Sequence, residues 1–257
     1  TYTGSGPLYM LYAEEGDVEP NISHSMQLVP AGDGRYLVYW PMSGKFLANS
    51  SSIYNGLNGW QYSTSDFTEA AMVKLSAVGG GYFEMQYDGE NSAGPLTLYV
   101  GAEMRDNVNS KMKTFDLEHK TALENGDYNQ GYSLPIAFNW SIYRASLDEA
   151  TVAALSISIA DLADSHLRPL IDKSNGYLKN YSDHNGYCNG EDEALETLLS
   201  TVEGSIATMG SVADIMDAEA KMLHALSVYM SVGLTKYEVQ ANDILASAEF
   251  SQYPYTP

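Results

Sequence analysis

Short runs of alternating apolar and polar residues fill the first part of the chain, and glycine-containing turns separate them. The clearest turn signals lie at residues 31–34, 41–44, 55–56 and 79–81. Regularly spaced short strands with glycine turns between them predict an all-β domain. Residues 7–12 and 138–144 alternate in the same way, and we expect them to be its opening and closing strands.

From residue 146 onward the apolar residues recur every three or four positions, which is the spacing of amphipathic helices. Ser146 and Glu149 fit a capping box, in which each side chain satisfies a free backbone amide, so the first helix is expected to open there. Pro169 is expected to kink or end this helix, because proline lacks the amide hydrogen that a helix interior needs.

Further helices are expected toward the C-terminus. The second covers about residues 191–209, and the third runs from Val212 to near Gly233. Thr235 and Glu238 fit another capping box, which predicts a short last helix to about residue 248. The spacing therefore predicts a bundle of three long helices with a shorter fourth.

The composition changes near residue 145. The residues before it include 16 of the 22 glycines and all three tryptophans. We therefore expect a mixed α+β chain with an all-β domain over residues 1–145 and an all-α domain over 146–250. Residues 251–257 are expected to be a tail or linker.

The β half contains an internal repeat. Residues 25–39 align with residues 71–85, and this alignment places Tyr36 opposite Tyr82, 46 positions later. Each copy is a strand, a glycine turn and a second strand that opens on an aromatic residue. Residues 44–48 and 96–101 then provide a further strand in each copy.

This arrangement, over about residues 7–145, resembles the ricin-type β-trefoil, whose repeats run through a glycine turn into GxYxI/L and then GKxL. The resemblance implies a lectin-like, carbohydrate-binding module. The family's sugar-binding Asp is replaced by Ala48 in one copy and by Val100 or Gly101 in the other, and no QxW motif is intact. A structural spacer with degenerate sugar sites is therefore one alternative, and an unrelated β-sandwich or barrel is another.

The helical half resembles the FIVAR-type three-helix modules of large secreted or surface-anchored bacterial proteins. The matching segments are residues 167–171, 194–198, 212–215 and 218–226. The resemblance covers about residues 147–232 and implies adhesion, spacing or weak recognition without catalysis. Both resemblances imply a secreted or cell-surface location in a bacterium, although the chain opens at Thr1 without a signal sequence.

The chain is acidic, with 33 Asp and Glu against 13 Lys and Arg and a net charge of −20. Such a surface excludes nucleic-acid binding through a basic patch. No apolar run approaches the ~20 residues that span a bilayer, so no membrane insertion is expected. The expected partner is a glycan or a protein surface, and the oligomeric state stays open.

Aromatic rings that stack on a sugar, beside amides that bind its hydroxyls, are typical of glycan sites. Trp60, Asn58 and Gln61 offer this combination in one loop-like stretch, with Tyr54 and Trp40 as further candidates. The alternative is that the tryptophans fill the barrel core, which we expect of Trp140.

No catalytic residue, metal site or cofactor is predicted. Residues 183–193 are rich in oxygen ligands but depart from the EF-hand pattern, so calcium binding there stays open. The acidic residues of this loop also suit the positive N-terminal end of the next helix. Cys188 is the only cysteine and lacks the flanking pattern of a protease nucleophile. A hydrolase acting on glycans through two carboxylates is the remaining hypothesis.

Overall fold

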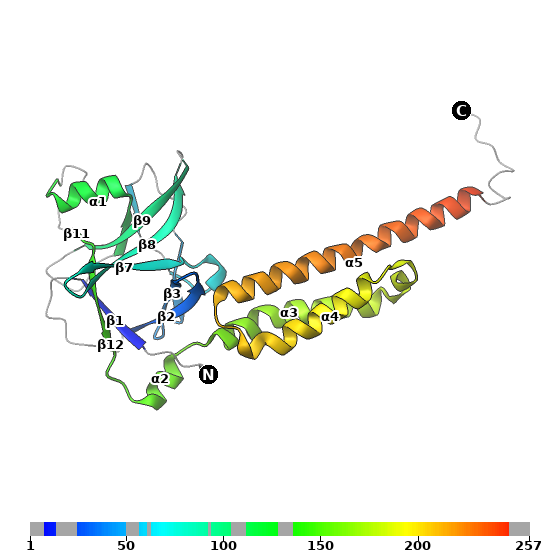
Figure 1. Cartoon of the computed structure of the whole chain (residues 1–257), viewed down its shortest axis with the longest axis horizontal. Coiled ribbons are helices and arrows are strands. Elements are labelled where there is room, and N and C mark those ends of the chain that lie inside the picture. Colours follow the sequence, from blue (N-terminus) through cyan, green and yellow to red (C-terminus); the bar gives the residue numbers. More distant parts are fainter. Residues whose placement is uncertain are drawn as a thin grey trace. The chain divides into compact units, whose positions relative to one another are not determined.

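The computed structural model divides into two compact units, residues 1–159 and 160–257, and each is described by itself. It describes residues 8–13, 25–49, 57–60, 63–91, 94–103, 112–127 and 136–246. The first unit contains a curled antiparallel sheet and the second consists of helices (Figure 1), so the expected α+β class is confirmed.

Among its described residues, the first unit contains the strands and three short helical segments. The strands are β1 (Leu8–Ala13), β2 (Ser25–Gly32), β3 (Arg35–Trp40), β4 (Lys45–Leu47), β5 (Leu57–Trp60), β6 (Ser63–Thr64), β7 (Val73–Gly79), β8 (Tyr82–Asn91), β9 (Gly94–Glu103), β10 (Met112–Phe115), β11 (Ile136–Ala137) and β12 (Asn139–Arg144). The helical segments are η2 (Phe67–Glu69), α1 (Leu117–Glu124) and α2 (Glu149–Leu155). β1 and β12 confirm the expected opening and closing strands.

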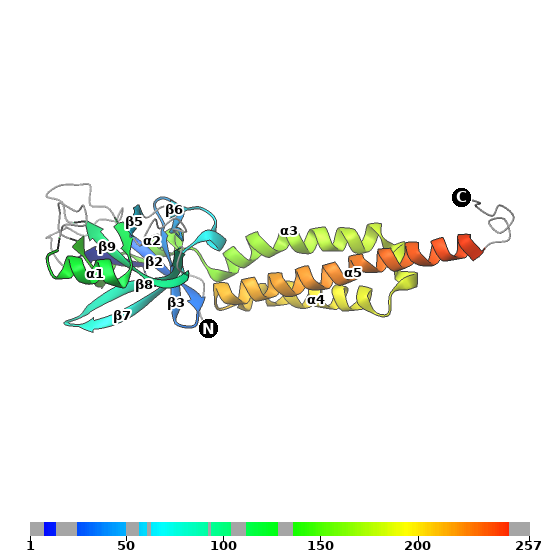
Figure 2. The same cartoon turned by 90° about the horizontal axis from the view of Figure 1, so that it is seen from above.

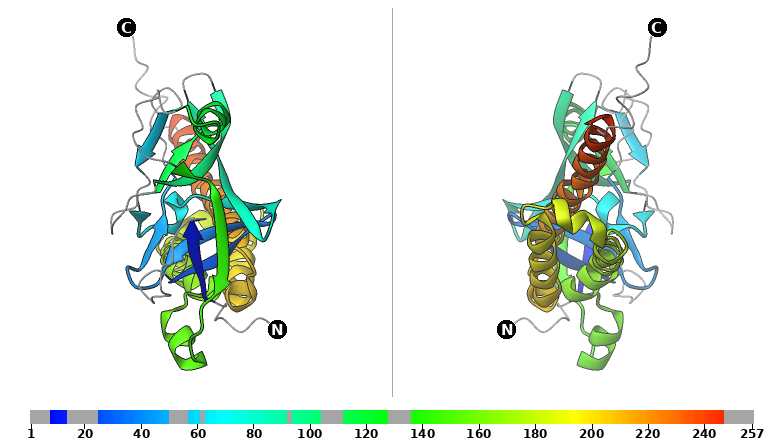
Figure 3. Two further views of the ribbon diagram at one scale, coloured as in Figure 1. Left: turned by 90° about the vertical axis from the view of Figure 1, so that its left-hand side faces the viewer. Right: turned by 90° about the vertical axis from the view of Figure 1, so that its right-hand side faces the viewer.

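Six of the strands pair in a circuit that returns to its start. β1 pairs with β2, β2 with β3, and β3 with β7; β7 pairs with β8, β8 with β12, and β12 with β1, all antiparallel. Figure 3 shows β1 in dark blue beside β12 in green, where the first and last strands of the sheet meet. The remaining strands lie outside this circuit. β4 and β6 continue the sheet from β3, and β9, β10 and β5 continue it from β8, while β11 pairs with β9.

The hairpins β2–β3 and β7–β8 are built alike. Gly32 pairs with Arg35 across one turn and Gly79 with Tyr82 across the other, and a register shift precedes each glycine. From these glycines onward, the φ angles are 103°, 52° and 70° in the first turn and 98°, 62° and 85° in the second. Positive φ at both central residues is the requirement of a tight type I′ hairpin.

This pairing corrects the alignment of the two copies by one residue. Gly79 stands where Gly32 does, which is a separation of 79 − 32 = 47 positions. Phe83, and not Tyr82, is therefore the counterpart of Tyr36. The alignment by pattern was wrong because two aromatic residues follow the second turn, and only the strand pairing shows which of them is equivalent.

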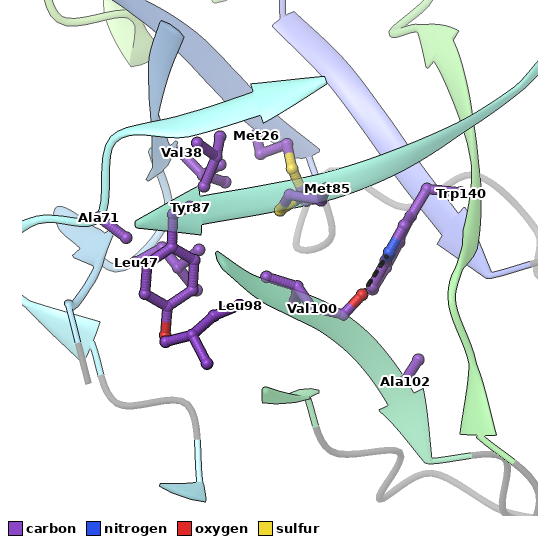
Figure 4. Packing of buried hydrophobic residues seen from close by; sticks show 11 residues of the cluster. Met26, Val38, Leu47, Ala71, Met85, Tyr87, Leu98, Val100, Ala102 and Trp140 are labelled. Carbon is purple, nitrogen blue, oxygen red and sulfur yellow. Dashed lines mark hydrogen bonds between the residues drawn. The ribbon is translucent and has the colours of Figure 1, made fainter. Parts of the chain in front are cut away.

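The main core lies inside the curled sheet, where side chains from both hairpins meet those of β9 and β12 (Figure 4). Its buried members are Met26, Val38, Leu47, Ala71, Val73, Met85, Tyr87, Leu98, Val100, Ala102 and Trp140. Trp140 is 5% exposed and its Nε1 donates to the carbonyl oxygen of Val100 at 3.0 Å, so its expected place in the core is confirmed.

A smaller apolar cluster covers the opposite face of β9. Phe115, Leu123 and Phe138 are buried there, and Tyr99 and Ile136 pack against them. Phe115 and Phe138 meet edge to face with their ring centroids 5.3 Å apart. Helix α1 is thereby fixed on the sheet through Leu123.

The second unit is helical, and Figure 2 shows its three long helices side by side. Its elements are α3 (Ile159–Asn180), η4 (Ser182–Tyr187), α4 (Glu191–Ser205), η5 (Ile206–Thr208) and α5 (Val212–Ala246). The expected helix over about 191–209 and the expected start at Val212 are confirmed. Among the described residues, no helix is long and apolar enough to cross a membrane.

The first predicted helix is two helices in the structure, α2 and α3, with the non-helical residues 156–158 between them. Asp148, and not Ser146, is the N-cap of α2, and its carboxylate accepts from the Thr151 amide at 2.9 Å. Pro169 lies inside α3 and does not end it. The missing amide hydrogen removes one helical bond, but Leu167 and Ile171 are buried on either side of the proline and hold the helix in place.

The last predicted boundary is also wrong, because α5 is one helix of 35 residues that passes through Gly233. The capping box predicted at Thr235 is not used. Gly233 is buried with Val232, so packing outweighs the glycine penalty of about 1 kcal/mol. Lys236 then forms an ion pair with Asp183 of η4, which fixes the helix beyond the glycine.

Candidate functional site

The predicted glycan-binding residues lie in separate parts of the sheet. Tyr54 and Gln61 lie outside the described residues. Asn58 and Trp60 are two positions apart in β5, and Trp40 ends β3. Strand β5 pairs with β10, whereas β3 pairs with β2, β4 and β7, so strand pairing does not bring Trp40 beside Trp60.

Trp40 has a structural role. Its side chain is half-buried and packs against the main core. Its carbonyl oxygen accepts hydrogen bonds from the amides of Ser43 and Gly44, at 3.1 and 3.0 Å, and thereby closes the turn between β3 and β4. Its ring is therefore engaged with the protein, which leaves less of it free to stack on a sugar.

Trp60 lies on the last strand of the sheet path, opposite Lys113 of β10. Leu57 of the same strand lies opposite Phe115. Strand β10, which pairs with β5, leads directly into α1. We call strands β5, β9 and β10 with helix α1 the β5–α1 region.

A buried lysine marks this region. Lys120 of α1 is 7% exposed, and its Nζ lies 2.9 Å from Glu84 Oε1 and 2.7 Å from Glu124 Oε2. The same Nζ lies 5.3 Å from the ring centroid of Tyr99 and 5.5 Å from that of Phe138. A buried ammonium group is tolerated when carboxylates and aromatic faces replace its water.

The pKa of Lys120 follows from two opposing effects. Burial lowers it, but hydrogen bonds and Coulombic attraction to Glu124 and Glu84 outweigh burial, so the pKa lies above its ordinary value. The amine is therefore charged at neutral pH and cannot act as a nucleophile or general base. It supplies a fixed positive charge that holds β8 against α1.

Asp116 and His119 form a second polar pair at the start of α1. Asp116 Oδ1 accepts from the His119 amide at 2.9 Å and lies 2.7 Å from Nδ1 of the His119 ring. A carboxylate held against one ring nitrogen is also the arrangement of catalytic His–Asp pairs. However, Asp116 is the N-cap of α1, and an N-cap aspartate commonly accepts a hydrogen bond from an amide of the first turn. Helix capping therefore also explains this pair.

The acidic loop of the second unit has structural partners. Asp183 pairs with Lys236, and Glu191 accepts a hydrogen bond from the Asn189 amide. Burial, followed by the charges of Asp192 and Glu191, raises the pKa of the Cys188 thiol, so it is protonated at neutral pH. Within the part of the chain that the structure describes, no three His, Cys, Asp or Glu side chains are grouped to hold a metal ion.

Comparisons with protein-family models, with curated proteins and with solved structures give no match to this chain. The candidate site therefore rests on its own geometry. Sequence reasoning missed the cluster around Lys120. The spacing of Lys120 and Glu124, four residues apart on a helix, could have indicated one ion pair. The partner Glu84 lies on a strand 36 positions earlier (120 − 84 = 36), which no local pattern reveals.

Proposed function

We propose that this chain is a non-catalytic binding segment of a secreted or cell-surface bacterial protein. Its first unit is a β-trefoil-like domain related to the ricin type, and it recognises a glycan or a protein surface. Its second unit is a FIVAR-like helical bundle that serves adhesion or spacing. The observation that supports this proposal is one pattern of strand pairing that recurs at three places in the sheet.

Three strand junctions of the circuit share one arrangement. Tyr9 pairs with Met26 between β1 and β2, Tyr36 with Val73 between β3 and β7, and Phe83 with Trp140 between β8 and β12. In each case an aromatic residue pairs with an apolar residue, and those three apolar residues belong to the main core. A trefoil repeats one such junction three times around its barrel.

The segments between the paired strands support the same proposal. After β3 the chain forms β4, β5, β6 and then η2, whose N-cap is Asp66. After β8 it forms β9, β10 and then α1, whose N-cap is Asp116. Strand pairing followed by an aspartate-capped helical turn thus occurs in both segments, as expected of two copies of one unit.

The ligand surface that we propose is the β5–α1 region. It combines the strand that carries Asn58 and Trp60 with Lys113 directly opposite. The charge pair of Lys120 and Glu84 fixes α1, which belongs to this region, to β8. A rigid platform with an aromatic residue and an amide at its edge suits a neutral polar ligand such as a sugar.

One observation favours the second candidate, a structural or protein-interaction spacer. The register makes Gly101 the counterpart of Ala48, where the family has its sugar-binding Asp. A Cβ on Gly101 would lie 2.6 Å from Ile136 Cγ2 and 2.9 Å from Phe138 Cε1. No side chain fits there, so this copy has no room for the family's carboxylate.

A glycan array followed by calorimetry tests the proposal. We expect binding of one class of glycan by the whole chain, abolished by Trp60→Ala. The matched control is Tyr143→Ala, which removes an exposed aromatic residue from β12, outside the β5–α1 region. Binding that both variants retain would place the ligand elsewhere. An array without signal would favour the spacer.

A further inference from the structure

Helix α5 has an apolar stripe separate from the face that packs into its unit. Positions 223, 227, 230, 234, 237, 241 and 244 are spaced alternately by four and three residues. Their occupants are Leu223, Ser227, Met230, Leu234, Tyr237, Ala241 and Ile244. This is the heptad spacing of a two-helix seam, sustained over three heptads.

Most of the stripe is open to solvent, and Met230 is half-buried. Leu223 is 48% exposed, Leu234 74% and Ile244 61%. The buried face of α5 consists of other residues, among them Met222, Leu226 and Tyr229. The two sets interleave along the helix, so the stripe lies beside the buried face and does not belong to it.

Apart from the ion pair of Lys236 with Asp183, the C-terminal part of α5 has little support of its own. Figure 2 shows its red end extending beyond α3 and α4. Every residue from Leu234 to Ala246 is exposed except Lys236, which is half-buried. A helical stretch of this length is marginally stable in water without a packing partner. A second helix on the stripe would supply that partner.

We propose that the stripe is a dimerisation seam that pairs with the same stripe of a second copy of this chain. A twofold interface uses one surface on both subunits, and a heptad seam is complementary to itself. The positions that flank the exposed half of the stripe are Ser231, Gly233, Glu238, Gln240 and Leu245. Only one of them is charged, so self-pairing does not bring rows of like charge together.

Because the chain is acidic, the salt dependence of binding distinguishes a second copy of this chain from a cationic partner. Each copy has a net charge of −20, so two copies repel one another at low ionic strength. Salt screens that repulsion and leaves the apolar contact, so dimerisation strengthens as salt is added. Binding of a basic helix would weaken under the same change.

Sedimentation equilibrium of the whole chain, over a range of protein and salt concentrations, tests the proposal. We expect a monomer–dimer equilibrium that tightens with salt. Leu234→Asp should raise its dissociation constant at least about a hundredfold, because the change occurs in both copies. The control is Val239→Asp, at an exposed aliphatic residue of the same helix outside the stripe, which should leave the constant within about threefold.

Ile244→Asp, at an exposed residue near the end of the helix, should weaken the dimer in the same way. Circular dichroism of each variant confirms that the helices are intact. A monomer at every concentration, or equal weakening by the control, would overturn the proposal. So would association only with an added lysine-rich amphipathic peptide, weakened by salt. These outcomes are independent of glycan binding by the first unit.

Discussion

The buried side-chain amide of Gln27 makes two hydrogen bonds with the backbone of Ile157. Gln27 Nε2 donates to the Ile157 carbonyl oxygen at 2.7 Å, and Gln27 Oε1 accepts from the Ile157 amide at 2.8 Å. Gln27 lies in β2, and Ile157 lies in the segment between α2 and α3. The amide thus bonds this segment as a neighbouring strand would, across 130 positions of sequence.

We predict that Gln27→Leu destabilises the first unit by about 2 kcal/mol, because both backbone groups of Ile157 lose their partner. Urea unfolding followed by tryptophan fluorescence measures this, since all three tryptophans lie in the first unit. The control is Gln86→Leu, which breaks a bond to the side chain of Glu84 only. Equal losses in both variants would contradict the special role of Gln27.

Truncation of Lys120 should also destabilise the first unit, because it removes a buried positive charge. Lys120→Ala leaves Glu84, which is largely buried, without its cation and opens a space beside Tyr99. We expect a loss of about 2–3 kcal/mol, less than for a fully buried pair because Glu124 is partly exposed. The exposed pair of Lys221 and Asp217 provides the control, and Lys221→Ala should cost under about 0.5 kcal/mol.

The same lysine predicts a dependence on alkaline pH. Because its pKa in the folded state lies above the ordinary value of 10.5, folding is favoured by the charged amine. That contribution is complete below pH 10.5 and is lost as the pH rises through the folded-state pKa. The stability difference between the wild type and Lys120→Met should therefore shrink above this pH. A constant difference across the alkaline range would show that packing alone accounts for it.

The close packing around Gly101 predicts that a larger residue at this position destabilises the first unit. Gly101→Ala would place a methyl group against Ile136 and Phe138, so we expect a loss of about 1–3 kcal/mol from overpacking. Ile136→Ala should relieve part of it in the double variant. Gly34→Ala is the contrast, because nothing lies near its Cβ and its cost comes from a φ of +70°. Additive losses in the Gly101 and Ile136 double variant would contradict the proposed clash.

The sequence predicts the general fold well because its signals are local. Glycine turns mark both hairpins, and apolar spacing marks the helices over 191–209 and after Val212. The register of the second copy was missed by one residue, since pairing between Gly79 and Tyr82 depends on the backbone of the turn. The predicted helix end near Gly233 is wrong, and Pro169 does not end its helix, because burial of neighbouring residues outweighs residue propensity.

The candidate site is less accessible to sequence reasoning. Trp140 could be assigned to the core, but Trp40, a candidate for the glycan site, is also engaged with the core. The contact of Lys120 with Glu84 joins a helix to a strand. Contacts of this kind arise from chain topology and leave no periodic signal along the sequence.

The thiol of Cys188 provides the last prediction. Burial and the nearby carboxylate of Asp192 both raise its pKa, so little thiolate is present at neutral pH. Asp192→Asn removes the negative charge and should lower the pKa, which speeds alkylation by iodoacetamide at any pH below it. Rates measured across pH separate this effect from accessibility, because only the pKa moves the midpoint of the profile. Glu193→Gln, an exposed neighbour in α4, is the control and should leave the midpoint unchanged. An unmoved midpoint in Asp192→Asn would mean that burial alone sets the pKa of this thiol.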